Sequence, residues 1–395
     1  MALALVLLTS AVLLIRTFVG LSTANPGIDP HNVLTLQTSL AGGNYSTTEK
    51  VDRFATQVIR RVEALPGVQG AALTIALPTD SEIDLPFNIV GKAPKAGQMY
   101  NGDEQYRFVS PHYFPVFRIP LMQGRLFSER DVGNSAKVVL INQAMANKYW
   151  PKGGAVGSVI LIGKGLGPQF DDGARQIVGV VGNVRETGVG DKETGVMYVP
   201  QSQVPQGLTQ LANSALPLCW SIRSSAEPKS ISTAVQREFR AVDGQMPVSK
   251  VCTMEEVISQ GVARQQFNML LLSIFAAIAL VLAAIGIYGL MSYSVEQQTQ
   301  ELGIRMALGA AKQDILRLIV RQGMTPALIG VGVGLAIAFG LTRLLASLLY
   351  GVKASDPLTF GGVAAVLLAV ALASTYIPAR RAARVDPALA LRDDV

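Results

Sequence analysis

Residues 267–293 contain no charged side chain, and this long uncharged run limits what the chain can fold into. A helix rises ~1.5 Å per residue and the hydrocarbon core of a bilayer is about 30 Å thick, so ~20 apolar residues can cross it. A helix on the surface of a soluble domain keeps a polar face, and this run has none. The run therefore predicts a transmembrane helix that is long enough to tilt.

Three further apolar segments predict additional spans. Residues 1–24 hold a short one, in which Arg16 must reach the lipid headgroups. A cleaved signal peptide that ends at residues 22–24 is the alternative, although no Lys or Arg precedes the apolar run. Residues 323–350 and 358–378 complete the set. Glycines within these last two segments predict close helix packing: Gly330, Gly332, Gly334, Gly361 and Gly362.

Composition and charge agree with a membrane protein. Only 16% of the residues are charged, against about 25% in an average soluble protein, and 49% are hydrophobic. The net charge of +6 is not gathered into a basic patch of the kind that binds nucleic acid. Residues 294–322 and 379–395 are both basic, so the positive-inside rule predicts that they are cytoplasmic, as is the N-terminus.

Residues 25–266 predict one large domain on the opposite side of the membrane. Residues 25–80 and 205–266 read as an α+β layer, with a capping box at residues 46–49 before a helix. Residues 81–204 read as an inserted, mostly-β subdomain. The predicted fold is therefore a membrane α-helical protein with four transmembrane helices. A large α+β extracytoplasmic domain is inserted between helices 1 and 2.

Residues 294–322 change character between two spans. Apolar residues recur there at helical spacing, on two short helices separated by a break at residues 309–311. Such a charged, amphipathic hook is a surface that another protein could hold, and a solvated loop is the equally simple alternative.

Motifs for catalysis or cofactor binding are absent from the sequence. It contains no P-loop, no H-E-x-x-H pair and no G-x-S-x-G elbow, so we expect no enzyme activity, metal or cofactor in this chain. The two histidines, His31 and His112, are far apart in sequence. Cys219 and Cys252 fall in two predicted strands of the outer domain, where either a disulfide or two free thiols is possible.

Two short motifs carry a resemblance to a known family. Residues 300–310 (QELGIRMALGA) and 378–392 (PARRAARVDPALALR) resemble the signatures of FtsX-like ABC transporter permeases. Gln300 stands where many members carry a basic residue. Outer-domain phrases such as residues 109–114, 123–127 and 177–182 occur in the order typical of a MacB-like periplasmic core domain. The chain is most similar to the C-terminal half of a long, tandem-duplicated permease, as a natural half or as a fragment.

The resemblance implies two sets of functional residues. The first would couple the permease to an ATPase: Glu301, Leu302, Gly303, Ile304, Arg305, Met306, Leu308, Gly309 and Ala310. The second forms the C-terminal motif: Pro378, Arg380, Arg381, Arg384, Asp386, Pro387, Leu391 and Arg392.

The resemblance also implies a mechanism and a location. A separate ATPase subunit would bind ATP and dock on the hook, and a second four-span unit, identical or in tandem, would complete the permease. Motion would pass to the periplasmic domain for efflux or export across the bacterial inner membrane. A membrane-anchored periplasmic sensor or scaffold is the alternative, and a membrane hydrolase is a third hypothesis, without a visible nucleophile.

Overall fold

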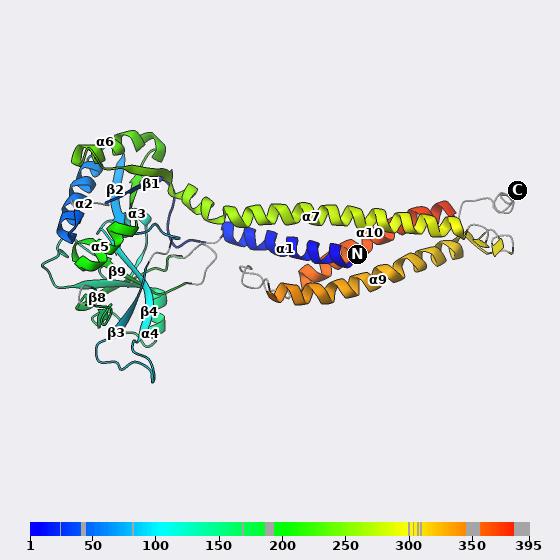
Figure 1. Cartoon of the computed structure of the whole chain (residues 1–395), viewed down its shortest axis with the longest axis horizontal. Helices are drawn as coiled ribbons and strands as arrows, with labels where there is room; N and C mark the ends of the chain where they lie inside the picture. The colour runs from blue at the N-terminus through cyan, green and yellow to red at the C-terminus, as the bar shows by residue number, and fades with distance from the viewer. Residues whose placement is uncertain are drawn as a thin grey trace. The chain divides into compact units, whose positions relative to one another are not determined.

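The computed structural model describes the chain except residues 24, 41–44, 81–82, 168–169, 186–192, 299–300, 303, 306–307, 309, 345–355 and 383–395. It divides into two compact units, and each is described by itself. The outer domain comprises Ala24–Gly261, and the helical unit comprises Met1–Thr23 with Val262–Val395. Figure 1 shows the elements of both units.

The outer domain is built on a mixed sheet whose strands are ordered β11-β1-β10-β2-β4-β3-β7-β8-β6-β9, with β5 paired to β8. In chain order the strands are β1 (Val33–Thr38), β2 (Val68–Thr74), β3 (Asp84–Ile89), β4 (Gly102–Val109), β5 (Leu121–Gly124), β6 (Val138–Asn142), β7 (Val159–Ile162), β8 (Ala174–Val181), β9 (Val196–Pro200), β10 (Leu218–Ser224) and β11 (Val248–Thr253). The helical segments are α2 (Thr48–Glu63), α3 (Tyr113–Phe117), α4 (Gln143–Tyr149), η2 (Gln201–Gln203), α5 (Gln206–Ala215), η3 (Pro228–Ile231) and α6 (Ser232–Val242).

The first half of the sheet is antiparallel and carries α2 and α6 on one face. The apolar residues of α2 recur at helical spacing and are buried: Val51, Phe54, Ala55, Val58 and Val62. Phe54 of α2 and Phe239 of α6 both meet Trp220 of β10 edge-on, at ring-centroid distances of 5.9 and 4.9 Å. The predicted capping box is wrong, because α2 begins one residue later. Its N-cap is Thr47, whose hydroxyl accepts the Lys50 N–H, so Glu49 lies in the first turn.

The second half of the sheet closes on itself. Strands β4, β3, β7, β8, β6 and β9 pair in a ring, because β9 returns to pair with β4 in parallel. Closure leaves these strands without an unpaired edge. One register pair, Thr74–Val109, joins β2 to β4 and so joins the two halves. The predicted mostly-β insert is thus a closed barrel, and it shares a hydrophobic core with the predicted α+β layer.

The two cysteines lie on either side of the same strand. Cys252 of β11 pairs with Thr35 of β1, and Cys219 of β10 pairs with Gln37 of β1. Strands are about 4.8 Å apart, so two cysteines separated by a strand are ~10 Å apart and cannot form a disulfide. Neither cysteine is in a disulfide; Cys219 is buried and Cys252 is half-buried.

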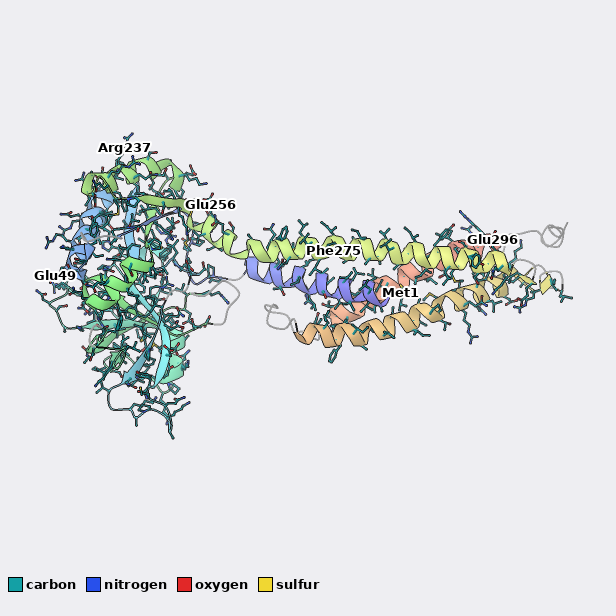
Figure 2. The ribbon with its side chains drawn as sticks, viewed as in Figure 1. Met1, Glu49, Arg237, Glu256, Phe275 and Glu296 are labelled. Carbon is teal, nitrogen blue, oxygen red and sulfur yellow. The ribbon has the colours of Figure 1, made fainter. Side chains whose placement is uncertain are left out.

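The helical unit contains four helices that are long and apolar enough to cross a membrane, at Ala2–Gly20, Gln266–Gln297, Lys312–Thr342 and Pro357–Arg381. They belong to α1 (Ala2–Thr23), α7 (Met254–Gln297), α9 (Lys312–Leu344) and α10 (Pro357–Ala382). Helix α1 packs between α9 and α10 around a small apolar core that includes Leu5, Val331 and Leu367. Most of α7 is exposed, and apolar side chains such as Phe275 project from it (Figure 2).

Two details of this unit differ from the prediction, and a third adds contacts to it. The helix that precedes the hook, α7, extends beyond the predicted span of residues 267–293. It begins at Met254 and ends at Gln297. The second short helix of the hook and the described part of the span predicted at residues 323–350 form one helix, α9, which continues through Pro326. Arg16, which was predicted to reach the lipid headgroups, pairs with Asp356 and donates to Thr359 Oγ1 at 3.0 Å.

Candidate functional site

The candidate coupling segment comprises residues 301–310, between α7 and α9. Among its predicted residues, Gly303, Met306 and Gly309 lie outside the described part of the chain. Residues 301–302 and 304–305 are helical, and Ala310 and Ala311 are not. The break predicted at residues 309–311 is therefore present at the two of these residues that the structure describes.

One side chain of the coupling segment is anchored in the helical unit. Leu302 is only 3% exposed. It lies in a small apolar cluster to which all three neighbouring helices contribute side chains. The other buried members of this cluster are Met291 of α7, Ile315 and Ile319 of α9, and Ala379 of α10. A force on the segment can therefore reach three helices through Leu302.

The opposite side of the segment is open. Leu308 is 83% exposed and Ile304 is 46% exposed, although both are large and apolar. Glu301 and Arg305, one turn apart, form an ion pair that is also exposed. An isolated pair of this kind contributes only ~0.3–0.5 kcal/mol, so it does not explain why these residues are there. The exposed face is chemically suited to contact another protein.

Close contacts near the segment hold the three helices together. A Cβ on Gly323 of α9 would lie 2.5 Å from Thr375 Cγ2 of α10 and 2.9 Å from Met291 Sδ of α7. Arg381 of α10 donates to the Tyr288 hydroxyl of α7 at 3.1 Å. Gly323 was not predicted as a contact residue, and its position one turn before Pro326 was the available signal.

The C-terminal motif is described only in part. Pro378 lies inside α10, with Ala379 buried in the cluster around Leu302 and with Arg380 and Arg381 exposed. The remaining predicted residues lie outside the described part of the chain: Arg384, Asp386, Pro387, Leu391 and Arg392. The structure thus brings the start of this motif against the coupling segment.

Of the five glycines that were predicted to pack closely against another helix, two do so. Cβ atoms on Gly330 and Gly334 of α9 would meet Met1 and Ala2 at 3.0 Å or less. Gly332, Gly361 and Gly362 have nothing within 4 Å of such an atom.

The outer domain shows no metal centre within its described residues, where no group of three or more His, Cys, Asp or Glu side chains could hold an ion. His31 pairs with Glu255, and His112 pairs with Glu63 at 2.7 Å. Each histidine therefore has one carboxylate as a hydrogen-bond partner.

Two family models match the chain. The MacB-like periplasmic core domain matches residues 1–242, and the C-terminal region of the FtsX-like permeases matches residues 273–387. The second match contains the coupling segment and the start of the C-terminal motif.

Curated relatives agree with these matches. The macrolide export ATP-binding/permease protein MacB of Wolinella succinogenes is 26% identical over 89% of this chain and 55% of its own length. The pyoverdine export ATP-binding/permease protein PvdT of Pseudomonas putida is 30% identical over 71% of this chain and 42% of its own length. The chain thus spans about half the length of the relatives that it matches.

Among solved structures, the periplasmic region of MacB from Actinobacillus actinomycetemcomitans matches 59% of this chain and 94% of its own, with 14% identity and a TM-score of 0.39. That likeness is too low to define the fold of the outer domain. The sequence matches, which cover most of the chain, place it among the FtsX-like ABC transporter permeases with a MacB-like periplasmic core domain.

Proposed function

We propose that this chain is the permease part of an ABC exporter and transmits ATP-driven motion to its outer domain. An ATP-binding domain outside residues 1–395 supplies the energy and docks on the coupling segment, so the chain itself needs no cofactor. Family membership supports this function, and so do the names of the relatives, which combine ATP binding with a permease.

The observation that carries the proposal is the contrast between Leu302 and Leu308. They lie six residues apart in one short segment, yet Leu302 is 3% exposed and Leu308 is 83% exposed. The buried leucine fixes the segment to α7, α9 and α10, and the exposed leucine is free to enter a pocket on the ATP-binding domain. Apolar side chains at the centre of an interface often contribute more than 1 kcal/mol to binding.

The spans suit a force-transmitting role better than a hydrophilic pathway. Residues 267–293, 324–342 and 358–377 contain no carboxylate that could carry a proton or cation. In this proposal the coupling segment and both termini are cytoplasmic, and the outer domain is periplasmic at the bacterial inner membrane. A second four-span unit, identical or in tandem, pairs with this one.

The test uses the full chain, tagged and extracted in detergent from its host membranes. Leu308→Ala is compared with Leu358→Ala, because Leu358 of α10 is 80% exposed and the two variants lose the same atoms without losing internal packing. We expect wild type and Leu358→Ala to capture the same ABC ATPase, and Leu308→Ala to capture about tenfold less, which corresponds to 1.4 kcal/mol.

Two outcomes would contradict the proposal. Equal capture by both variants would remove the coupling role from Leu308. If no ATPase is captured by any form, while other proteins bind the outer domain, the chain acts as a membrane-anchored scaffold.

A further inference from the structure

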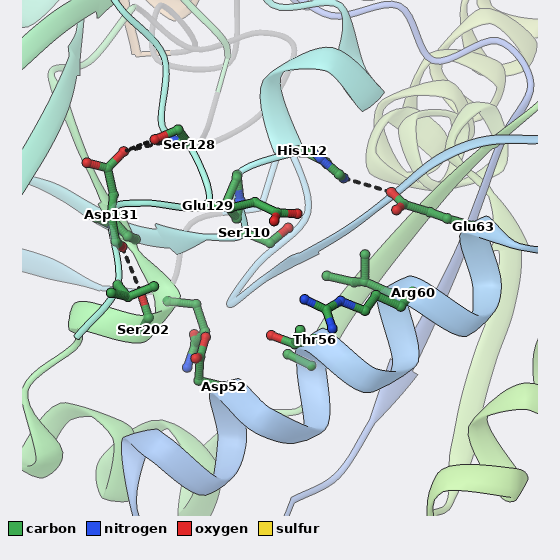
Figure 3. Close-up of a pocket in the computed structure, with 16 residues that line it drawn as sticks. Asp52, Thr56, Arg60, Glu63, Ser110, His112, Ser128, Glu129, Asp131 and Ser202 are labelled. Carbon is green, nitrogen blue, oxygen red and sulfur yellow. Dashed lines mark hydrogen bonds and ion pairs between the residues drawn. The ribbon is translucent and has the colours of Figure 1, made fainter. Parts of the chain in front are cut away.

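The outer domain contains a cavity of ≈ 180 Å³ that the coupling mechanism does not use (Figure 3). One face of α2 forms a wall, and the turn between β4 and α3, the loop after β5 and the junction of β9 with η2 form the others. The volume is enough for a ligand group of several heavy atoms. All the lining residues belong to the outer domain.

Two acidic groups on the rim of this cavity are already satisfied. Glu63 Oε1 accepts from His112 Nδ1 at 2.7 Å and from the Ala71 N–H at 3.0 Å. Asp131 accepts two hydrogen bonds from the Arg125 guanidinium, both 2.8 Å long. These pairs shape the walls and leave no charge to be neutralised by a ligand.

Asp52 differs from them. It lies on the α2 face of the cavity, one turn from Thr56 (Figure 3), and it is half-buried. Burial raises the pKa of its carboxyl. Glu129, across the cavity, adds a second negative charge. A carboxylate in such surroundings is stabilised when a cation enters.

Gln201 provides an independent indication of a ligand. It lines the same cavity and is 4% exposed, and its Oε1 is buried without a hydrogen-bond donor within the described structure. A buried carbonyl oxygen without a donor is costly, and few remain in native structures without a reason. A ligand with N–H groups would supply the missing donor after a small rotation of the amide.

We propose that the cavity binds the ammonium end of a small primary amine, which donates to the Asp52 carboxylate and to the Gln201 carbonyl. The alkyl stem lies against Ala55 and Ile59 of α2, which also line the cavity. Arg60, two turns from Asp52 on the same face, opposes a second positive charge. The cavity therefore favours a monoamine over a diamine.

The probe is n-butylammonium, titrated against the full chain in detergent and followed by saturation-transfer NMR. 1-Butanol, butyrate and putrescine serve as the neutral, anionic and doubly charged comparisons. We expect n-butylammonium to bind with a dissociation constant of about 1 mM, as its few heavy atoms allow. The three comparison compounds should bind at least fivefold more weakly.

Asp52→Asn keeps the shape of the side chain and removes its charge, so it should weaken butylammonium binding at least tenfold. Glu49→Gln is the matched control, because it removes one charge from an exposed position of the same helix that does not line the cavity (Figure 2). It should bind like wild type. Equal binding by Asp52→Asn would overturn the proposal, and so would the absence of amine binding to wild type.

Gln201→Met separates a ligand-binding role from a structural one. Met has a similar length without the carbonyl, so amine binding should fall at least fivefold while the melting temperature without ligand stays unchanged or rises. A melting temperature several degrees lower would mean that the Gln201 carbonyl already has a partner in solution. That result would overturn its assignment. None of these readouts depends on an ATPase, so the site can be refuted while the proposed export function stands.

Discussion

Arg175 of β8 forms a bidentate ion pair with Asp172, and both side chains are fully buried. The same guanidinium donates to the Val138 carbonyl at 3.0 Å and to Gln203 Oε1 at 2.9 Å. Gln203 in turn donates to the loop that precedes β6. One cation therefore connects a barrel strand, the neighbouring strand β6 and η2, next to the amine-binding cavity.

We predict that Arg175→Met destabilises the protein by about 3 kcal/mol, because Lys137, at 3.4 Å, is then the one ion-pair partner left to the buried Asp172 carboxylate among the described residues. Denaturant unfolding of the full chain in detergent, followed by tryptophan fluorescence, measures this loss. Arg61→Met is the control, since it breaks the Arg61–Glu238 pair between α2 and α6, which is open to solvent. Its effect should stay below about 1 kcal/mol. Similar losses in both variants would mean that burial does not set the strength of the Arg175 pair.

A second prediction concerns two glycines of α9, where the same change to Ala should affect stability in opposite directions. Gly323→Ala should destabilise the helical unit by about 1–3 kcal/mol, because its new Cβ meets Thr375 and Met291. Gly332→Ala should be neutral or stabilising, because nothing lies within 4 Å and Ala favours a helix over Gly. Melting temperatures in the same detergent compare the two. A stabilising Gly323→Ala would show that the three helices do not meet closely at this point.

The third prediction is a pH dependence of the His112–Glu63 pair. Hydrogen bonding to Glu63 raises the pKa of His112 above its ordinary 6.5. Burial alone would raise the pKa of Glu63, but hydrogen bonds from His112 and Ala71 hold it below its ordinary 4.5. The contribution of protonated His112 to folding stability is complete below pH 6.5 and is lost as the pH rises through its raised pKa. The contribution of ionised Glu63 to folding stability is complete above pH 4.5 and is lost as the pH falls through its lowered pKa.

Both contributions are therefore complete between pH 4.5 and 6.5. The difference in melting temperature between wild type and His112→Gln should be largest in that window and smaller near about pH 8. His31→Gln is a useful comparison, because the His31–Glu255 pair is largely exposed and should change stability little. A wild-type advantage that grows above the window would contradict the sign of this argument.

The fourth prediction concerns thiol reactivity. Cys252 is half-buried and Cys219 is buried, so maleimide should label Cys252 first in the native protein and both residues after denaturation. No reductant should be required, because the two cysteines flank β1 and are too far apart to bond. Mass spectrometry of the labelled peptides reads out both results. Labelling of neither cysteine in denaturant without reductant would reveal a disulfide and contradict the strand order.

Regular patterns made part of the fold predictable. Strand-like apolar runs located β1, β10 and β11, and helical spacing located α2 and α6, within the layer predicted at residues 25–80 and 205–266. Helices α2 and α6 each bury one apolar face, whereas every residue of β10 is buried. The four spans followed from hydropathy. In these regions local sequence and tertiary burial agree.

Strand β4 was not predicted from the sequence, because its buried side chains include charged ones that are satisfied by polar partners elsewhere in the chain. Its sequence, GDEQYRFV, has no apolar alternation, yet Glu104 and Arg107 are buried. Lys148 and the Tyr149 hydroxyl both donate to Glu104, and Arg107 donates to the Asp80 carbonyl at 2.7 Å. Closure of the barrel joins β4 to β9 across nearly ninety residues of chain, and no local pattern encodes such a pairing.

The candidate coupling segment was predictable as a stretch but not in its detail. Leu302 and Leu308 are the same residue type on one short segment, and only the positions of Met291, Ile315 and Ala379 decide which one is buried. The cavity beside α2 could not be predicted either, since its walls come from four separate parts of the chain.

The close contacts of Gly323 with α7 and α10 would serve as a fulcrum if α9 turned as a rigid rod. Eleven residues separate Lys312 from Gly323 and 21 separate Gly323 from Leu344, so at ~1.5 Å per residue the two arms measure about 16 and 32 Å. In such a turn, a sideways displacement at the Lys312 end would be about doubled, and reversed in direction, at the Leu344 end. Pro326, within a turn of the fulcrum, can change the angle between the arms but not their ratio. A small stroke beside the coupling segment would then become a larger one at the other end of the same helix.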